Sequence, residues 1–150
     1  MKRIFNFLLI LFISVNVLNA QKPYVEYWQN GQKATEGTLS DKNIRIGEWR
    51  WFYENGSLQK IGEYNEKGLK VGEWKDYYAD GKLQKQEFLS GKGECKAFYD
   101  NGQIQYSYNV VDGLKQGEYN EYYKNGNKKI QASYKDNALD GYATWFFSDG

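Results

Sequence analysis

The feature that most constrains this 150-residue chain is a ten-residue block that begins and ends with glycine and occurs five times. The blocks are Gly47–Gly56, Gly72–Gly81, Gly93–Gly102, Gly117–Gly126 and Gly141–Gly150, and a degenerate sixth copy, YVEYWQNG, ends at Gly31. The closing glycines lie 25, 25, 21, 24 and 24 residues apart, whereas the block itself keeps its length. Self-similarity at such a period is typical of repeat proteins, in which each unit contacts only its neighbours.

Each block ends in Asn-Gly or Asp-Gly, the dipeptide most typical of a tight hairpin turn of type I′. Each block is therefore expected to be a strand that runs into such a turn, and a returning strand follows. A second turn is expected before the next block, where residues that tolerate a positive φ recur at Asn43, Gly68, Gly91, Gly113 and Asn137. Two turns in about 24 residues leave no room for a helix. The only proline, Pro23, precedes the array.

The pattern predicts an all-β fold: an elongated antiparallel β-hairpin repeat, in which about a dozen short strands form a single-sheet meander over residues 21–150.

Residues 1–20 do not share the repeat pattern. Lys2 and Arg3 precede an apolar run from Ile4 to Leu18, and Ala20 stands where a signal peptidase would cut. We expect a secretory signal peptide and a mature chain that begins at Gln21, with retention as an anchor as the alternative, and hence a periplasmic, outer-envelope or secreted protein.

Composition excludes several kinds of chemistry. The chain has no histidine and one cysteine, so it cannot build an imidazole-based catalytic triad or a zinc site with histidine ligands. Cys95 occupies a position that is aromatic in other blocks and is expected to be a buried apolar group. Loss of Lys2 and Arg3 with the leader would change the formal net charge from +1 to −1, and the charges are interspersed. No nucleic-acid partner, basic membrane patch, cofactor or metal is expected.

Aromatic residues recur within the blocks. Counted from the opening glycine, the fifth position holds Phe or Tyr, and the sixth holds Tyr in four of the five copies. Adjacent positions face opposite sides of a strand, so both faces carry rings. We expect the fifth position on the drier face and the sixth on a wetter one. The rings are expected to form the core of a thin sheet; alternatively, one row forms an exposed binding platform, made of Trp51, Tyr53, Tyr78, Tyr99 and Tyr123.

A second recurring position is the glutamate after the opening glycine, found at Glu48, Glu73, Glu94 and Glu118. Paired carboxylates could serve a glycosidase or bind calcium. A solvated charged row, with Lys60, Lys75, Lys85 and Lys96 nearby as partners, is the simpler interpretation. The chain is therefore expected not to be an enzyme.

The block G-E-W-x-x-Y-Y-x-N-G, followed by a variable strand, resembles the MORN repeat variant of bacterial proteins, including the antitoxin YwqK-type family. Gly47, Trp49, Tyr53, Asn55, Gly56, Gly68 and Gly72 match the motif, and Cys95 and Ala143 depart from it. The resemblance implies an extended hairpin array that acts as a scaffold for proteins or membranes, or an antitoxin that neutralises a partner protein.

These expectations combine into one functional hypothesis: an exported, non-enzymatic scaffold that binds a protein or an envelope component through its sheet surface. The alternatives are an antitoxin or immunity protein and, less favoured, a carbohydrate-active protein that uses the glutamate row. The last block is followed by no returning strand in this sequence. Trp145, Phe146 and Phe147 are therefore expected on an unpaired edge strand, which could support self-association.

Overall fold

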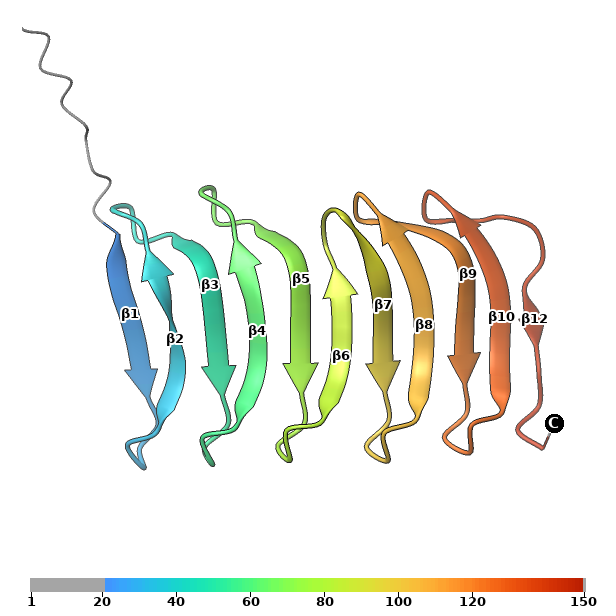
Figure 1. The fold of residues 1–150 in the computed structure, drawn as a ribbon, viewed down its shortest axis with the longest axis horizontal. Coiled ribbons are helices and arrows are strands. Elements are labelled where there is room, and N and C mark those ends of the chain that lie inside the picture. Colours follow the sequence, from blue (N-terminus) through green and yellow to red (C-terminus); the bar gives the residue numbers. More distant parts are fainter. Residues whose placement is uncertain (1–20, 150) are drawn as a thin grey trace, which may run out of the picture.

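The protein is a single open sheet of twelve strands without a helix, in a computed structural model that describes residues 21–149. The strands lie side by side in one row, in sequence order from β1 to β11, and β12 pairs with β10 (Figure 1). Their bounds are β1 Lys22–Tyr27, β2 Lys33–Leu39, β3 Arg45–Phe52, β4 Leu58–Tyr64, β5 Lys70–Tyr77, β6 Leu83–Phe88, β7 Lys92–Phe98, β8 Ile104–Val111, β9 Leu114–Tyr122, β10 Lys128–Lys135, β11 Ala138–Leu139 and β12 Thr144–Trp145.

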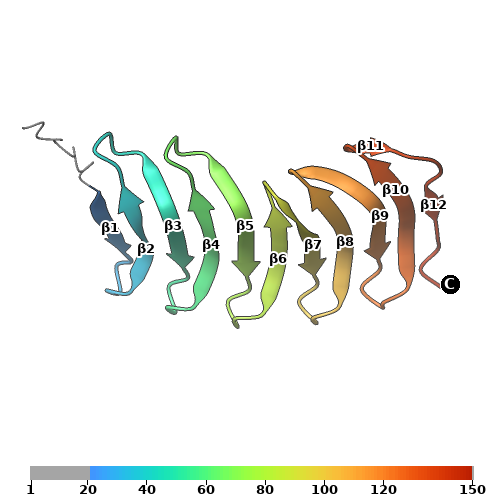
Figure 2. The same ribbon diagram turned by 45° about the horizontal axis from the view of Figure 1, so that its top comes forward.

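All pairs are antiparallel, and consecutive strands from β1 to β11 are neighbours, so the predicted single-sheet meander is confirmed. Figure 2 shows the same single row of strands from a second direction. No second layer of the described residues covers the sheet. The predicted leader, residues 1–20, lies outside the described residues. Within residues 21–149 there is no helix long and apolar enough to cross a membrane.

The Asn-Gly and Asp-Gly turns differ from the predicted type I′. At Gly56, the turn consists of three residues, with Gly56 N donating to Tyr53 O at 2.9 Å and Tyr53 N to Ser57 O at 2.9 Å. Only Gly56 has a positive φ, of 82°, so Glu54 and Asn55 form a type I turn that Gly56 follows as a bulge. Asn55 keeps a negative φ, and its Oδ1 accepts a hydrogen bond from Ser57 N at 3.0 Å.

Type I′ turns do occur, at the opposite ends of the strands. Asp112 and Gly113 have φ values of 52° and 77°, and their flanking residues Val111 and Leu114 pair directly. Asp136 and Asn137 have φ values of 51° and 68°. The turn-forming positions were thus predicted correctly, but the turn type at the closing glycines was wrong.

The opening glycine of a block has a structural function of its own. Between the pairs Thr38↔Ile46 and Glu36↔Arg50, β3 has two more residues than β2. Gly47, with a φ of 65°, lies in this bulge. Gly72 and Gly117 repeat the arrangement with φ values of 65° and 71°. The bulge turns the second position of the block onto the sheet face where Trp49 and Trp74 are buried.

Candidate functional site

The two faces of the sheet differ in chemistry. Cross-strand partners lie on the same face, so the registers assign each side chain. We call the side that carries Trp49, Trp51 and Trp74 the aromatic face, and the side that carries Glu48, Arg50 and Lys75 the charged face. The second position of the blocks is the core of the aromatic face: Trp49 and Cys95 are each 1% exposed, and Trp74 is also buried. The prediction of a buried Cys95 is confirmed.

The N-terminal half of the aromatic face holds a cluster of rings, which we call the tryptophan cluster: Tyr24, Trp49, Trp51, Tyr64 and Trp74. Trp51 lies between the other two indoles, with centroid distances of 6.1 Å to Trp49 and 5.8 Å to Trp74. The indole nitrogens of the two buried tryptophans donate to backbone carbonyls: Trp49 Nε1 to Ile46 O at 3.2 Å and Trp74 Nε1 to Val71 O at 3.1 Å. The N–H groups of these two indoles are therefore already hydrogen-bonded within the sheet.

Two cations lie on this cluster. The Arg45 guanidinium is 4.7 Å from the Trp49 ring centroid and 5.7 Å from that of Trp51, and Lys70 Nζ is 4.2 Å from the Trp74 centroid. Neither cation has a carboxylate within ion-pair distance among residues 21–149. Both therefore offer positive charge to a ligand. A hollow of about 500 Å³ opens between them, with Trp51, Tyr53, Gln59 and Asp76 among its lining residues.

The C-terminal half repeats the arrangement with tyrosines. Tyr106, Tyr108, Tyr119 and Tyr134 form the tyrosine cluster. Lys115 Nζ lies 4.5 Å from the Tyr108 centroid, 4.6 Å from Tyr119 and 4.4 Å from Tyr134. Burial lowers the pKa of Lys115 below its ordinary value. Burial raises the pKa of Tyr119, and its hydrogen bond to Glu121 raises it further.

The predicted platform residues occupy one face, in two roles. Trp51 belongs to the tryptophan cluster, and Tyr53 and Tyr78 line hollows of the same face. The tyrosines of the sixth position are half-buried, and their hydroxyls donate to the chain one hairpin further on. The bonds are Tyr53 to Tyr77 O at 2.7 Å, Tyr78 to Phe98 O at 2.9 Å, Tyr99 to Tyr122 O at 2.8 Å and Tyr123 to Phe146 O at 2.9 Å.

This arrangement corrects the expected division into a drier and a wetter face. The sixth position shares its face with the buried second position, whereas Tyr77 of the fifth position lines a hollow of the charged face with Glu73 and Lys75. The tyrosine hydroxyl is a poor indicator of solvent here because its partner is a backbone carbonyl. In the degenerate first copy, Trp28 Nε1 makes the equivalent bond to Phe52 O at 3.1 Å.

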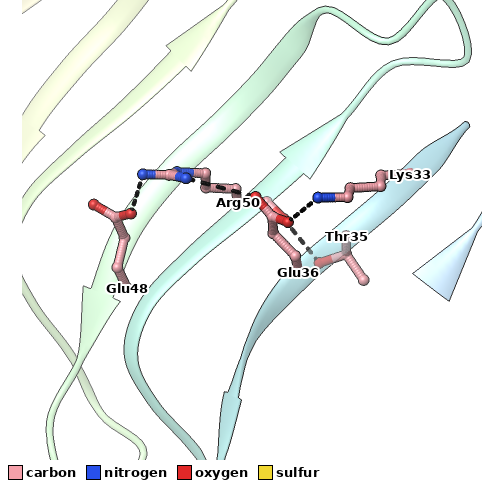
Figure 3. Close-up of polar contacts among 5 residues, drawn as sticks. All are labelled: Lys33, Thr35, Glu36, Glu48 and Arg50. Carbon is pink, nitrogen blue, oxygen red and sulfur yellow. Dashed lines mark hydrogen bonds and ion pairs between the residues drawn. The ribbon is translucent and has the colours of Figure 1, made fainter. Parts of the chain in front are cut away.

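The glutamate row lies on the charged face, and three of its members are ion-paired with the residue two positions later. The distances are 2.5 Å for Glu48–Arg50 and 2.7 Å for both Glu73–Lys75 and Glu94–Lys96. Arg50 also contacts Glu36, which pairs with Lys33, so the charges form a chain across β2 and β3 (Figure 3). Two expected partners lie elsewhere, because Lys60 pairs with Asp76 and Lys85 with Glu87.

No group of acidic or cysteine side chains among residues 21–149 is arranged to hold a metal ion.

The last strand, β12, is paired on one side: Trp145 lies opposite Ile130, and Phe146 N donates to Lys129 O at 3.0 Å. The expected edge strand thus has β10 on one side and no strand of residues 21–149 on the other. Trp145 and Phe147 are nevertheless 69% and 82% exposed.

Sequence reasoning missed the cations of the aromatic face. Arg45, Lys70 and Lys115 all stand two residues before an opening glycine. The recurrence of a cation at this position is visible in the sequence. Its location on the aromatic face could not be inferred, because the bulge at the opening glycine places the cation over the ring of the second position.

Comparison with known proteins agrees with this architecture. No curated protein matches the chain. The family model described as "MORN repeat variant" matches four segments, residues 45–66, 70–89, 92–112 and 115–136, which together make up more than half of the chain. Each segment contains one whole block and its returning strand. The chain therefore belongs to the MORN repeat variant family and is a β-hairpin repeat scaffold.

Proposed function

We propose that this protein is a non-enzymatic scaffold that binds a partner protein along its aromatic face. The observation that carries the proposal is the pair Arg45 and Lys70, which rest on the tryptophan cluster without carboxylate partners among the described residues. On the charged face, by contrast, the cations Arg50, Lys75 and Lys96 are neutralised by glutamates. Aromatic and arginine side chains are also the residues most enriched where proteins bind one another.

We further propose that the protein acts outside the cytoplasm. This part of the proposal is supported by the leader-like sequence of residues 1–20. An envelope-bound protein is therefore the partner class to examine first. Neutralisation of a toxin would be one form of such binding, and only the resemblance to antitoxin-type proteins supports it.

A non-enzymatic role is supported by the state of the carboxylates. A general acid or nucleophile needs a site that shifts its pKa and a cleft that holds the substrate. Glu48, Glu73 and Glu94 lie on an open sheet face, and each is paired with a cation. These glutamates are better explained as solvated surface charges than as catalytic groups.

The proposal is tested by crosslinking in the native host, with partner identification by mass spectrometry. The double variant Arg45→Gln/Lys70→Gln should lose the specific crosslinks, because it removes the free charges of the tryptophan cluster. The matched control, Lys75→Gln/Lys96→Gln, alters the charged face by the same number of charges and should keep them. Equal loss in both variants, or retention in both, would contradict binding through the aromatic face.

A further inference from the structure

A bulge at the turn end of every full hairpin turns one extra side chain toward the aromatic face. In the hairpin of β3 and β4, the pairing passes from Trp51↔Lys60 to Phe52↔Leu58 and leaves Gln59 without a ladder partner. The next two hairpins leave Gln84 and Gln105 in the same way. Bulges are common beside functional sites because they redirect a side chain. Here they place a glutamine at the same point of three consecutive hairpins.

These glutamines lie in a continuous depression, which we call the furrow. It consists of three hollows of about 500, 500 and 270 Å³ that share walls. The first two share Arg45, Trp51 and Gln59, and the last two share Asp76 and Gln84. The furrow thus crosses the strands from β1 to β8, along the long axis of the sheet.

The glutamine amides are free polar groups that recur along the furrow, beside the cations Arg45 and Lys70. Gln59, Gln84 and Gln105 make no side-chain hydrogen bond with any other residue of 21–149. Three neighbouring polar groups are engaged: the Tyr53 and Tyr78 hydroxyls donate to backbone carbonyls, and Asp76 pairs with Lys60 at 3.0 Å. Each step of the furrow therefore offers one free amide beside a tyrosine ring.

The spacing of these steps selects the conformation of a chain that could follow them. Equivalent residues of consecutive hairpins are two strands apart, about 9.5 Å. A polyproline II helix has three residues per turn and advances about 9.3 Å per turn. An extended strand repeats every two residues, about 6.7 Å, and an α-helix every turn, about 5.4 Å. Only the polyproline II conformation stays in step with the furrow over several hairpins.

We infer that the furrow binds a proline-rich segment of a partner protein in the polyproline II conformation. One backbone carbonyl per turn accepts a hydrogen bond from Gln59, and the next turn does so from Gln84. Proline rings pack on Tyr53 and Tyr78, and an acidic residue of the segment faces Arg45. This inference rests on the proposed function and names the chemistry of the partner.

The same furrow suits a sugar chain less well. A sugar ring presents several hydroxyl groups and is held by several polar side chains, whereas the two carboxylates that line the furrow are already engaged: Asp76 pairs with Lys60, and Glu26 accepts a hydrogen bond from the Tyr24 hydroxyl. A proline-rich segment needs ring contacts and few hydrogen bonds, because its carbonyls are its only backbone polar groups at proline.

The test uses a fluorescent peptide of one glutamate followed by about nine prolines, which is three turns of polyproline II. Anisotropy titration should show saturable binding to the wild type. The Gln59→Ala/Gln84→Ala variant should weaken it about tenfold, as expected for two lost hydrogen bonds. Gln86→Ala is the matched control, because Gln86 is on the same strand as Gln84 but pairs with Lys75 and Lys96 on the charged face. Circular dichroism checks that each variant keeps its fold.

Three results would overturn the inference: no saturable binding, equal binding of a glycine-serine peptide of the same length and charge, or glutamine-dependent binding of an N-acetylglucosamine oligosaccharide in place of the peptide. The crosslinking experiment separates this failure from failure of the proposed function. Specific crosslinks that depend on Arg45 and Lys70 would still uphold binding through the aromatic face if the peptide did not bind.

Discussion

At the scale of single residues, the aromatic face depends on glycines that leave room for rings. A Cβ built on Gly62 would lie 2.1 Å from the Trp74 ring, and one on Gly37 would lie 2.3 Å from the Trp49 ring. Neither glycine has a positive φ, so packing and not backbone conformation requires it. A small residue also lies opposite a large one in the C-terminal half, where Cys95 pairs with Tyr108.

Gly62→Ala therefore tests the packing directly. In an ordinary strand this change would stabilise the fold slightly by restricting the unfolded chain. Here the methyl group overlaps the indole of Trp74, so we expect a loss of about 1–3 kcal/mol in the free energy of unfolding. Urea denaturation measures the change, with Glu63→Ala on the exposed charged face as the control. A stabilised Gly62→Ala variant would contradict this packing.

The tyrosine cluster predicts a dependence of stability on alkaline pH. Burial raises the pKa of Tyr119 and of Tyr108 in the folded protein, whereas a tyrosine in the unfolded chain keeps a pKa of about 10. Below that pH both states are protonated. Above it the unfolded chain loses protons first, so stability falls as pH rises toward the folded pKa. Lys115, whose pKa burial lowers, acts in the opposite direction.

Comparison with Tyr119→Phe isolates the tyrosine contribution. Urea denaturation at about pH 8 and about pH 11 should show a smaller loss of stability for the variant than for the wild type. Lys115 is present in both proteins, so its effect largely cancels. An identical loss in the two proteins would show that Tyr119 titrates as an exposed tyrosine.

At the scale of the hairpin, asparagine side chains link each turn to the next. Asn55 Nδ2 donates to Ala79 O at 3.1 Å, and the same bond joins Asn30 to Glu54 O, Asn101 to Lys124 O and Asn125 to Ser148 O. Asp80 has no amide to donate and instead pairs with Lys82 at 2.8 Å. The third turn therefore lacks one inter-hairpin bond.

Asp80→Asn should supply this bond. The new amide bond joins two hairpins, whereas the ion pair with Lys82 that is lost is exposed and therefore screened by solvent. We expect a small increase in the thermal unfolding midpoint. Asp41→Asn, in a turn at the other end of the strands, should leave the midpoint unchanged. A lower midpoint for Asp80→Asn would mean that the ion pair outweighs the new bond.

The hairpins illustrate what could be predicted from the sequence. The glycine-bounded blocks predicted the strands and turns because turn residues carry strong local preferences. The turn type at Gly56 could not be predicted, since it depends on a bulge where β3 and β4 pair. The face of Tyr53 was wrongly assigned because its hydroxyl, taken as a sign of solvent, donates to a backbone carbonyl of the next hairpin. The bulges at the turn ends also place Gln59 and Gln84 in the furrow. The sequence shows that these glutamines recur, but it does not show which face of the sheet they occupy.

At the scale of the whole molecule, the sheet has a weak junction between β6 and β7. Only two residue pairs join these strands, Lys85↔Ala97 and Gln86↔Lys96. The link missing at Asp80 would cross the same junction. No aromatic contact among residues 21–149 joins the tryptophan cluster to the tyrosine cluster. The Tyr78 hydroxyl, which bonds to Phe98 O, is one of the few remaining ties.

Hydrogen exchange should therefore show a stability minimum at this junction. In repeat arrays, stability is the sum of unit terms and nearest-neighbour terms, so a weak interface lets the two halves open separately. The backbone amides of β6 and β7 should exchange faster than those of β3, β4, β8 and β9, and Tyr78→Phe should widen the difference. Uniform protection across the sheet would instead show that the array unfolds as one unit.

The ends of the sheet lead to the last prediction. β1 and β12 each leave one edge unpaired within the described residues, and Trp145 and Phe147 are largely exposed beside the C-terminal edge. An open strand edge with exposed rings favours pairing with another chain, and pairing of unlike edges would produce open linear assemblies. Light scattering after size-exclusion chromatography should therefore show a mass that rises with concentration. Phe146→Lys should reduce it by placing a charge at that edge, whereas Tyr142→Lys, at a side chain that is 95% exposed and outside the strand, should not. A wild type that stays monomeric at every concentration would show that these edges do not pair.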